Sequence, residues 1–200
     1  MMINIPTEFV FDPQNPIREE REASTRYLAD LRGYFVDSDQ FEAALSIENS
    51  LVYKVWTLKW ASGGADLICG FGTLMPGKIG QEYFFTKGHF HKRREAAEIY
   101  QGLSGTGYIL MEHEHSGHSW VVPLVPNSIV YVPGYTAHRT INTGTVPLNY
   151  IGINVADAGY DYERIRERNF ANILIEHNGQ AVMIERSQYL ASKLKDSSRD

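Results

Sequence analysis

The sequence predicts an all-β domain, an antiparallel sandwich or barrel with an N-terminal arm and a few short helices. From residue 51 onward, short runs rich in β-branched and aromatic residues alternate with turn residues, at a spacing of about 8–12 residues. Near the C-terminal end, Asn178-Gly179 separates ILIEH from AVMIE, which is a strong signal for a two-residue hairpin turn. Both patterns favour neighbouring antiparallel strands over alternating strands and helices.

The N-terminal region, residues 1–48, is expected to form an arm and a short helix that pack on the barrel. Its first half is polar and contains prolines, which favours mostly irregular structure. Ser38–Ile47 predicts a helix, with Ser38 as its cap and with Phe41 and Leu45 on one face.

Residues 49–186 are expected to form the barrel, and residues 187–200 a loose polar tail. Within the barrel, YERIRERNF predicts one short helix before the hairpin. The expected strands are 51–60, 65–75, 79–86, 98–103, 107–113, 118–124, 128–133, 137–142 and 148–155.

Composition excludes several classes of function. The chain has 200 residues, is 43% hydrophobic and carries a formal charge of −5, which argues against a nucleic-acid or anionic-membrane partner. Cys69 is the one cysteine, so no disulfide can form within the chain. The N-terminus lacks the pattern of a signal peptide, and no run of residues is apolar enough to span a membrane. We therefore expect a cytoplasmic protein.

The most informative stretch is Gly88-His89-Phe90-His91. On a strand, side chains at i and i+2 point to the same face, so His89 and His91 would project together and could share one metal ion. Imidazole suits iron, zinc, nickel, copper and manganese alike, so the ligand type does not choose the metal. A second segment, PGYTAHRTIN, carries His138.

Together these segments resemble the two motifs of the cupin superfamily. The first is His-x-His, then Glu, six residues and Gly; the second is Pro-x4-His-x3-Asn, and both occur here in order. The resemblance implies a small antiparallel jelly-roll barrel that holds one metal ion through three histidines and a glutamate. Glu95 and Glu98 both fit the spacing, and we favour Glu98 because it begins an apolar strand, whereas Glu95 lies in the charged stretch KRREAA.

Further blocks resemble the cupin-type phosphoglucose isomerases of archaea and some bacteria, over residues 30 to 185 or so. The blocks are GYFVD, PGKIG, EYFFTKGH, AEIY, VYVP, AHRT and ADAG. The resemblance implies interconversion of glucose 6-phosphate and fructose 6-phosphate, a homodimer, and one divalent metal ion, often Fe²⁺, with Mn²⁺, Ni²⁺ or Zn²⁺ as alternatives. It places the metal on His89, His91, Glu98 and His138, and the substrate phosphate on Thr86 and Gly88.

The chain departs from that family at three positions near the expected substrate. Asn154 stands where archaeal members carry tyrosine, Tyr160 where they carry histidine, and Gly72 where a threonine is expected. Thr73 is adjacent, but an offset of one residue on a strand places a side chain on the other face. The departures leave the expected metal ligands untouched.

The expected reaction moves a proton between C1 and C2, which requires a base and stabilisation of an oxyanion. Glu98 is the candidate base for an enediol route, and a hydride shift is the alternative mechanism. Tyr100, on the same face as Glu98, is either a residue that orients a sugar hydroxyl or a core aromatic. The phosphate needs donors, which the Gly88 N–H and the Thr86 hydroxyl could supply, with Lys87 or the trio Lys92-Arg93-Arg94 adding charge.

Other candidates carry less weight. His113, His115 and His118 have metal-like spacing but straddle a Ser-Gly turn, which predicts an exposed hairpin tip. His177 is expected at the surface, and Cys69 as a small buried residue. Two rival functions use the same fold: another cupin metalloenzyme (a dioxygenase or a different sugar isomerase), and a non-catalytic sugar-binding cupin.

Overall fold

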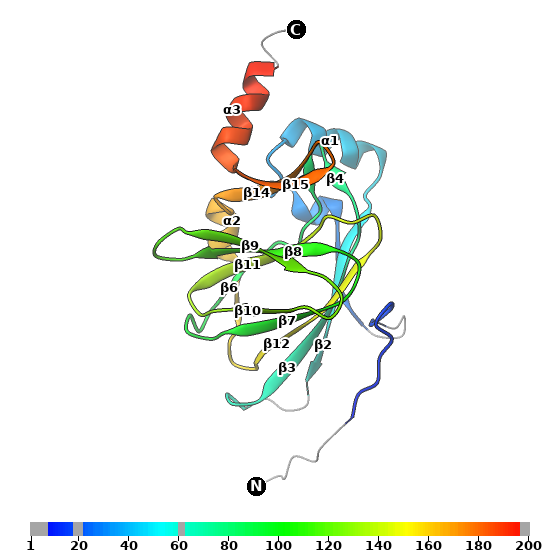
Figure 1. The fold of residues 1–200 in the computed structure, drawn as a ribbon, viewed down its shortest axis with the longest axis vertical. Coiled ribbons are helices and arrows are strands. Elements are labelled where there is room, and N and C mark those ends of the chain that lie inside the picture. The colour runs from blue at the N-terminus through cyan, green and yellow to red at the C-terminus, as the bar shows by residue number, and fades with distance from the viewer. Residues whose placement is uncertain (1–7, 18–21, 60–62, 197–200) are drawn as a thin grey trace.

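Two facing antiparallel β-layers form the centre of the computed structural model, which describes residues 8–17, 22–59 and 63–196 (Figure 1). The larger layer has six strands in the order β1-β2-β3-β12-β7-β10. Its strands are β1 Ser24–Tyr27, β2 Leu51–Lys59, β3 Leu67–Leu74, β12 Leu148–Val155, β7 Glu98–Ser104 and β10 Ile129–Val132.

The facing layer has three strands in the order β11-β8-β9. A short pair, β6 with β13, extends this layer, because His89 forms an antiparallel bridge with His138 of β11. These strands are β11 Thr136–Asn142, β8 Gly107–His113, β9 Ser119–Leu124, β6 Phe90–His91 and β13 Tyr160–Asp161. The predicted all-β antiparallel class is confirmed.

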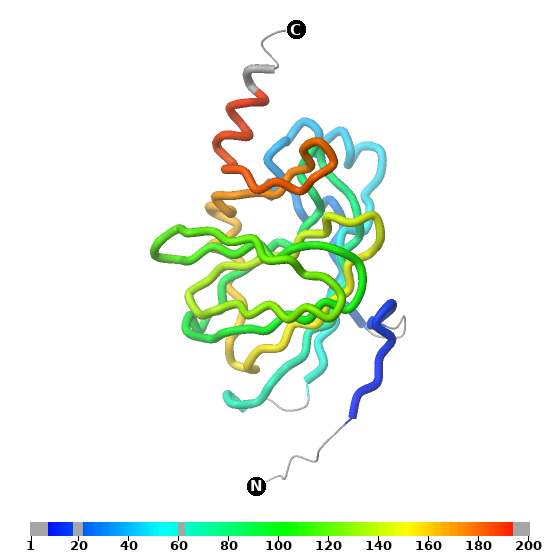
Figure 2. Tube along the Cα trace, viewed as in Figure 1, coloured from blue at the N-terminus to red at the C-terminus, as the bar shows by residue number. Residues whose placement is uncertain are grey.

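A smaller four-stranded sheet, β15-β14-β5-β4, lies with α1 and α3 at the end of the molecule that is uppermost in Figure 1. Figure 2 shows the described N-terminal segment, in blue, and the C-terminal helix α3, in red, on opposite sides of the barrel. The remaining elements are β4 Lys78–Ile79, β5 Glu82–Tyr83, β14 Asn172–His177, β15 Gln180–Glu185, the 3₁₀ helix η1 Leu28–Leu31, and the helices α1 Ser38–Ile47, α2 Glu163–Arg168 and α3 Arg186–Asp196.

The main core fills the space between the layers, and a second cluster covers the outer face of β3. Phe71 points outward from β3 and packs against Phe9 and Phe11 of the N-terminal segment, with ring centroids 5.5 and 5.1 Å apart. Both faces of β3 are therefore covered. This explains why apolar residues follow one another along the strand instead of alternating with polar ones. The inner face of the same strand is left for the core and the cavity.

Three local expectations differ from the structure. The cap of α1 is Asp37, whose side chain accepts a hydrogen bond from the Gln40 N–H, and not Ser38. The expected strand over 79–86 is broken into β4 and β5, because Gly80 adopts a positive φ of 56° between them. β1, at a place in the N-terminal arm where no strand was expected, is paired with β2.

The tail expected over 187–200 is a helix as far as Asp196. Its anchor is Tyr189, which is buried in a small cluster with Val36, Ile173 and Ile175. Residues 1–7 of the expected arm and 197–200 of the tail lie outside the described residues. None of the described helices combines the length and the apolar character needed to cross a bilayer.

Candidate metal centre and active-site cavity

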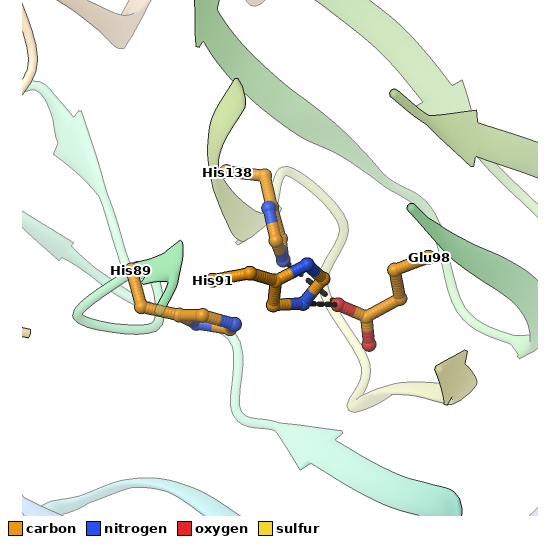
Figure 3. Close-up of side chains that lie close together, drawn as sticks. All are labelled: His89, His91, Glu98 and His138. Carbon is orange, nitrogen blue, oxygen red and sulfur yellow. Dashed lines mark hydrogen bonds and ion pairs between the residues drawn. The ribbon is translucent and has the colours of Figure 1, made fainter. Parts of the chain in front are cut away.

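Three histidines and one glutamate converge inside the barrel, from three separate places in the chain (Figure 3). His89 and His91 lie at β6, Glu98 begins β7 on the opposite layer, and His138 lies on β11. One ligand atom from each residue lies within 4.8 Å of those of the other three. The structure thus brings together the four residues that the sequence singles out.

Backbone carbonyls hold two of the imidazoles in place. The Ala96 carbonyl oxygen lies 2.9 Å from His91 Nδ1, and the Thr136 carbonyl oxygen lies 3.2 Å from His138 Nδ1. Because a carbonyl can only accept, both Nδ1 atoms carry hydrogen, and each Nε2 is turned toward the carboxylate of Glu98. The distances from Glu98 Oε2 to these Nε2 atoms are 3.2 Å for His91 and 2.9 Å for His138.

The surroundings of the third imidazole, that of His89, indicate that the cluster is suited to binding a cation. His89 Nε2 is buried and has no hydrogen-bond partner among the described residues. A buried nitrogen without a partner is costly, and a metal ion would satisfy it together with the two other Nε2 atoms. Three nitrogens and one carboxylate oxygen around one point are a donor set that suits a divalent transition metal.

The electrostatics of the cluster agree with this assignment. Burial, together with the proximity of His138, holds the pKa of His89 well below its ordinary value, so this imidazole is neutral and able to bind a metal. Burial by itself would raise the pKa of Glu98, but hydrogen bonds from His138 and His91 hold it far below its ordinary range. Glu98 is therefore ionised, as a metal ligand must be.

Two glycines make room for the cluster. Gly88 has a φ of +76°, and a Cβ there would lie 2.9 Å from the His138 carbonyl oxygen and 2.8 Å from the Phe170 ring. A Cβ on Gly152 would lie 2.6 Å from Glu98 Oε1. The close approach of the strands that carry the four residues therefore depends on both glycines.

A cavity of about 530 Å³ opens onto this cluster. Its volume lies within the range of about 300–1,000 Å³ that is typical of small-molecule sites. Thr86, Gly88 and Tyr100 all line it, so the residues expected to contact the substrate face the same space as His89, Glu98 and His138. Tyr100 is also buried, with its ring 5.7 Å from that of His138.

The three departures from the resembled family also line or border the cavity. Tyr160 packs edge-on against His89 at a centroid distance of 4.8 Å, and its hydroxyl is hydrogen-bonded to Asn154. Burial raises the pKa of Tyr160 to about 12, so its hydroxyl keeps its proton. A Cβ on Gly72 would lie 2.1 Å from the ring of Tyr150, so the glycine leaves the space that this tyrosine occupies.

Several candidates lie away from the cavity. Glu95 is exposed. In the basic trio, Arg93 pairs with Asp157, and Arg94 pairs with Glu114 and Asp161, so these two charges serve ion pairs within the protein.

The second histidine group does not converge on one point within the described part of the chain. His113 Nδ1 lies 3.1 Å from the Ser116 hydroxyl, and His118 packs against Trp120. His177 is exposed, and Cys69 is buried and unpaired. Burial raises the pKa of the Cys69 thiol to about 11, which makes it a poor nucleophile.

Other cavity residues had no local signal in the sequence. Arg26 of β1, Tyr53 of β2 and Arg166 of α2 all line the cavity. Arg26 lies in the N-terminal arm, where no strand was expected, and Arg166 lies in a short charged helix that resembles any solvated surface. Their approach to the site depends on how distant elements pack.

The comparison that decides the family covers most of the chain. The family model for glucose-6-phosphate isomerase (GPI) matches residues 25–191. The chain belongs to the glucose-6-phosphate isomerase family. The match includes every residue of the cluster and all of the cavity-lining residues named above.

Individual relatives agree with the family model. A glucose-6-phosphate isomerase from Pyrococcus horikoshii is 37% identical over 188 residues, which cover 94% of this chain and 99% of that protein. One from Thermococcus kodakarensis is 41% identical over 164 residues, which cover 82% and 86%. Among solved structures, an oxalate decarboxylase from Bacillus subtilis aligns with a TM-score of 0.44 at 20% identity, over 53% of this chain and 26% of that one.

Proposed function

We propose that this protein is a metal-dependent glucose-6-phosphate isomerase that interconverts glucose 6-phosphate and fructose 6-phosphate. The observation that carries the proposal is the cluster of His89, His91, Glu98 and His138, three of which line a cavity, in a chain of this family. We assign these four residues as the ligands of one divalent metal ion. When bound, such an ion would act as a Lewis acid toward the sugar oxygens at C1 and C2.

Glu98 has two oxygens in different surroundings, and we assign them different tasks. Oε2 faces the imidazoles of His91 and His138. Oε1 faces Gly152, which lines the cavity and has no side chain to cover it. Oε1 is therefore the atom assigned to take a proton from one of the two reacting carbons and return it to the other.

Residues of the cavity wall are assigned to bind the sugar and its phosphate group. The pKa of Tyr100 is raised well above its ordinary value, mainly by burial and secondly by the negative charge of Glu98. Its hydroxyl therefore remains protonated and can donate a hydrogen bond. Tyr100 lies two residues from Glu98 on the same face of β7 and is assigned to orient a sugar hydroxyl. Thr86 and Gly88 are assigned to the phosphate end of the substrate.

A coupled assay tests the function. Fructose 6-phosphate is supplied, and the glucose 6-phosphate formed is oxidised by a dehydrogenase whose reduced cofactor is followed by absorbance. Protein loaded with Fe²⁺, Mn²⁺, Ni²⁺ or Zn²⁺ is compared with protein treated with a chelator. We expect turnover that the chelator removes and a metal restores; no turnover with any of these metals would refute the proposal. Turnover of unphosphorylated sugar, or oxygen consumption with iron, would favour the rival cupin enzymes.

Solvent deuterium tests the role of Glu98. If its carboxylate carries the proton, it exchanges with water, and glucose 6-phosphate formed in D₂O carries deuterium at C2. Product without solvent deuterium would contradict this role and favour a direct hydride shift.

The proposal includes iron as the preferred ion, a homodimer and a cytoplasmic location. The imidazole and carboxylate donors support iron but also suit manganese, nickel and zinc, so the test is which ion gives the highest turnover. Light scattering of the metal-loaded protein checks for a dimer, and cell fractionation checks the location.

A further inference from the structure

The chain segment that leads into the metal cluster contains one residue more than the strand with which it pairs. Phe85 is bridged to Ile141 of β11, and His89 is bridged to His138 of the same strand. Between these bridges lie three residues of the segment, 86–88, but only two residues of β11. An extra residue on one of two paired strands is a β-bulge.

The bulge lies at Lys87 and Gly88. Regular pairing continues as far as Thr86, whose N–H donates to the Thr140 carbonyl oxygen at 2.9 Å, and it resumes at His89. Lys87 and Gly88 therefore share one position opposite β11. Gly88 has a φ of +76°, a conformation that glycine adopts without strain, so the bulge has the residue that it requires.

The bulge changes the side of the layer to which the segment directs its side chains. Phe85 and His89 are four residues apart, so in a regular strand both would point to the same side. Their partners Ile141 and His138 are three residues apart on β11 and face opposite sides. Phe85 accordingly packs in the core, 4.4 Å from the ring of Phe35, whereas His89 faces the cavity with His138 (Figure 3). The extra residue thus turns His89 toward the metal cluster.

Arg139, the residue of β11 opposite the bulge, is bonded to it through its side chain. Its Nη2 donates to the Lys87 carbonyl oxygen at 2.8 Å and to Asn169 Oδ1 at 2.9 Å. The guanidinium lies 4.3 and 4.2 Å from the ring centres of Phe85 and Phe170. Because the Lys87 carbonyl lies outside the regular pairing, the guanidinium supplies the donor that a neighbouring strand supplies elsewhere.

The position of Arg139 is costly unless the guanidinium has a task there. The residue is 2% exposed, and among the described residues its Nε has no hydrogen-bond partner and no carboxylate lies at ion-pair distance. Glu82 attracts it from farther away. An apolar side chain of similar size would fill the same space without the cost of burying a cation. What the guanidinium adds is its hydrogen bonds to the Lys87 carbonyl and to Asn169.

His89 depends on its backbone for its direction more than the other two histidines of the cluster do. His91 and His138 are each fixed by a backbone carbonyl at Nδ1. Within the described part of the chain, the ring of His89 has no such hydrogen bond. A shift of the bulge would therefore be passed on directly to His89 Nε2.

We propose that Arg139 is a positioning residue of the metal centre: its guanidinium fixes the bulge at Lys87-Gly88 and thereby keeps His89 aimed at the metal ion. This inference rests on the proposed function, which assigns one divalent ion to the cluster. Arg139 touches neither the ion nor the substrate, and it acts through the Lys87 carbonyl.

Metal titration of single variants tests the inference. Co²⁺ is added to metal-free protein, and its visible absorption gives the dissociation constant. In Arg139→Met this constant should rise about 10- to 100-fold, as is typical when the support of a metal ligand is removed. Arg139→Lys keeps a donor for the Lys87 carbonyl and should recover part of the loss. If Arg139→Met does not fold, Arg139→Gln, which is too short to reach that carbonyl, takes its place with the same expectation.

Arg186→Met is the matched control. Arg186 is also a partly buried guanidinium that donates to backbone carbonyls, those of Tyr34 and Phe35, at 3.1 and 3.4 Å. Its loss should lower the free energy of unfolding but leave the Co²⁺ dissociation constant unchanged. An equal rise of the dissociation constant in the Arg139 and Arg186 variants would indicate general destabilisation and would overturn the inference.

NMR of the imidazole nitrogens gives a signature that loss of stability alone does not produce. In the unmodified protein, Zn²⁺ should shift the signals of His89, His91 and His138 together. In Arg139→Met the shift of His89 should be reduced, while those of His91 and His138 persist. An unchanged Co²⁺ dissociation constant with a normal His89 shift overturns this inference and leaves the proposed function intact. Absence of metal binding in the unmodified protein overturns both.

Discussion

Glu82 predicts a pH dependence of stability that has nothing to do with catalysis. Its carboxylate is buried at the base of the small sheet, where Oε2 accepts a hydrogen bond from the Val36 N–H at 2.8 Å. Oε1 has no hydrogen-bond partner among the described residues. Burial raises the pKa of Glu82 from 4.5 to about 7, against the opposing effects of the Val36 bond and the charges of Arg186 and Arg139.

The sign and size of the effect follow from these two pKa values. The folded protein holds the proton more tightly than the unfolded chain, so ionisation of Glu82 opposes folding. The cost is absent well below pH 4.5, grows as the pH rises and levels off above pH 7. Linkage with pKa values of 4.5 and about 7 gives a cost of about 1 kcal/mol at pH 5 and about 3 kcal/mol at pH 8.

The test is the variant Glu82→Gln, which keeps an oxygen to accept from Val36 but cannot ionise. Free energies of unfolding are measured in urea at pH 5 and pH 8 for metal-free protein at one concentration. All other groups titrate alike in the two proteins. From pH 5 to pH 8, the free energy of unfolding of the variant should therefore rise by about 2 kcal/mol relative to that of the unmodified protein. Parallel pH profiles for the two proteins would refute the argument, and Glu95→Gln, on an exposed residue, should give such parallel profiles.

The remaining predictions concern the site. Glu98→Ala should lose bound metal and turnover, whereas Glu95→Ala should keep both; metal analysis and the coupled assay measure this, and the reverse result would mean that the first motif is misassigned. Gly72→Ala should displace the ring of Tyr150, which lowers the free energy of unfolding in urea by about 1–3 kcal/mol and reduces turnover. An unchanged urea unfolding curve would contradict this packing. Chelation should lower the melting temperature of metal-loaded protein, because an ion that binds only the folded site stabilises it, and no shift would argue against a bound ion.

Local patterns in the sequence were enough to predict most of the barrel strands and the helices α1 and α2. Alternation, turn residues and the Asn178-Gly179 pair each depend on neighbouring residues only, and the hairpin turn indeed has both residues at positive φ, 51° and 76°. The helix Ser38–Ile47 was predicted with its observed bounds, while its cap was misplaced by one residue because Asp37 and Ser38 are both good caps.

Elements that depend on distant contacts were not predicted. The β1 strand exists because its backbone pairs with β2, and the C-terminal helix is held by Tyr189 against residues near positions 36 and 174. A short polar sequence carries no information about such partners, since its own propensity is weak. The sequence therefore predicted no strand in the N-terminal arm and a loose C-terminal tail, where the structure has the strand β1 and the helix α3.

For the site, the sequence by itself determined which four side chains could hold a metal and what chemistry they suit. His89 and His91 share a face by strand alternation, and Glu98 and His138 follow from motif spacing, so the donor set is encoded locally. Only the tertiary structure decided which cations accompany that set, because Arg26, Lys87 and Arg166 meet through strand register and the docking of α2. It also separated free charges from paired ones: burial and ion pairing depend on the packing of residues far apart in the chain.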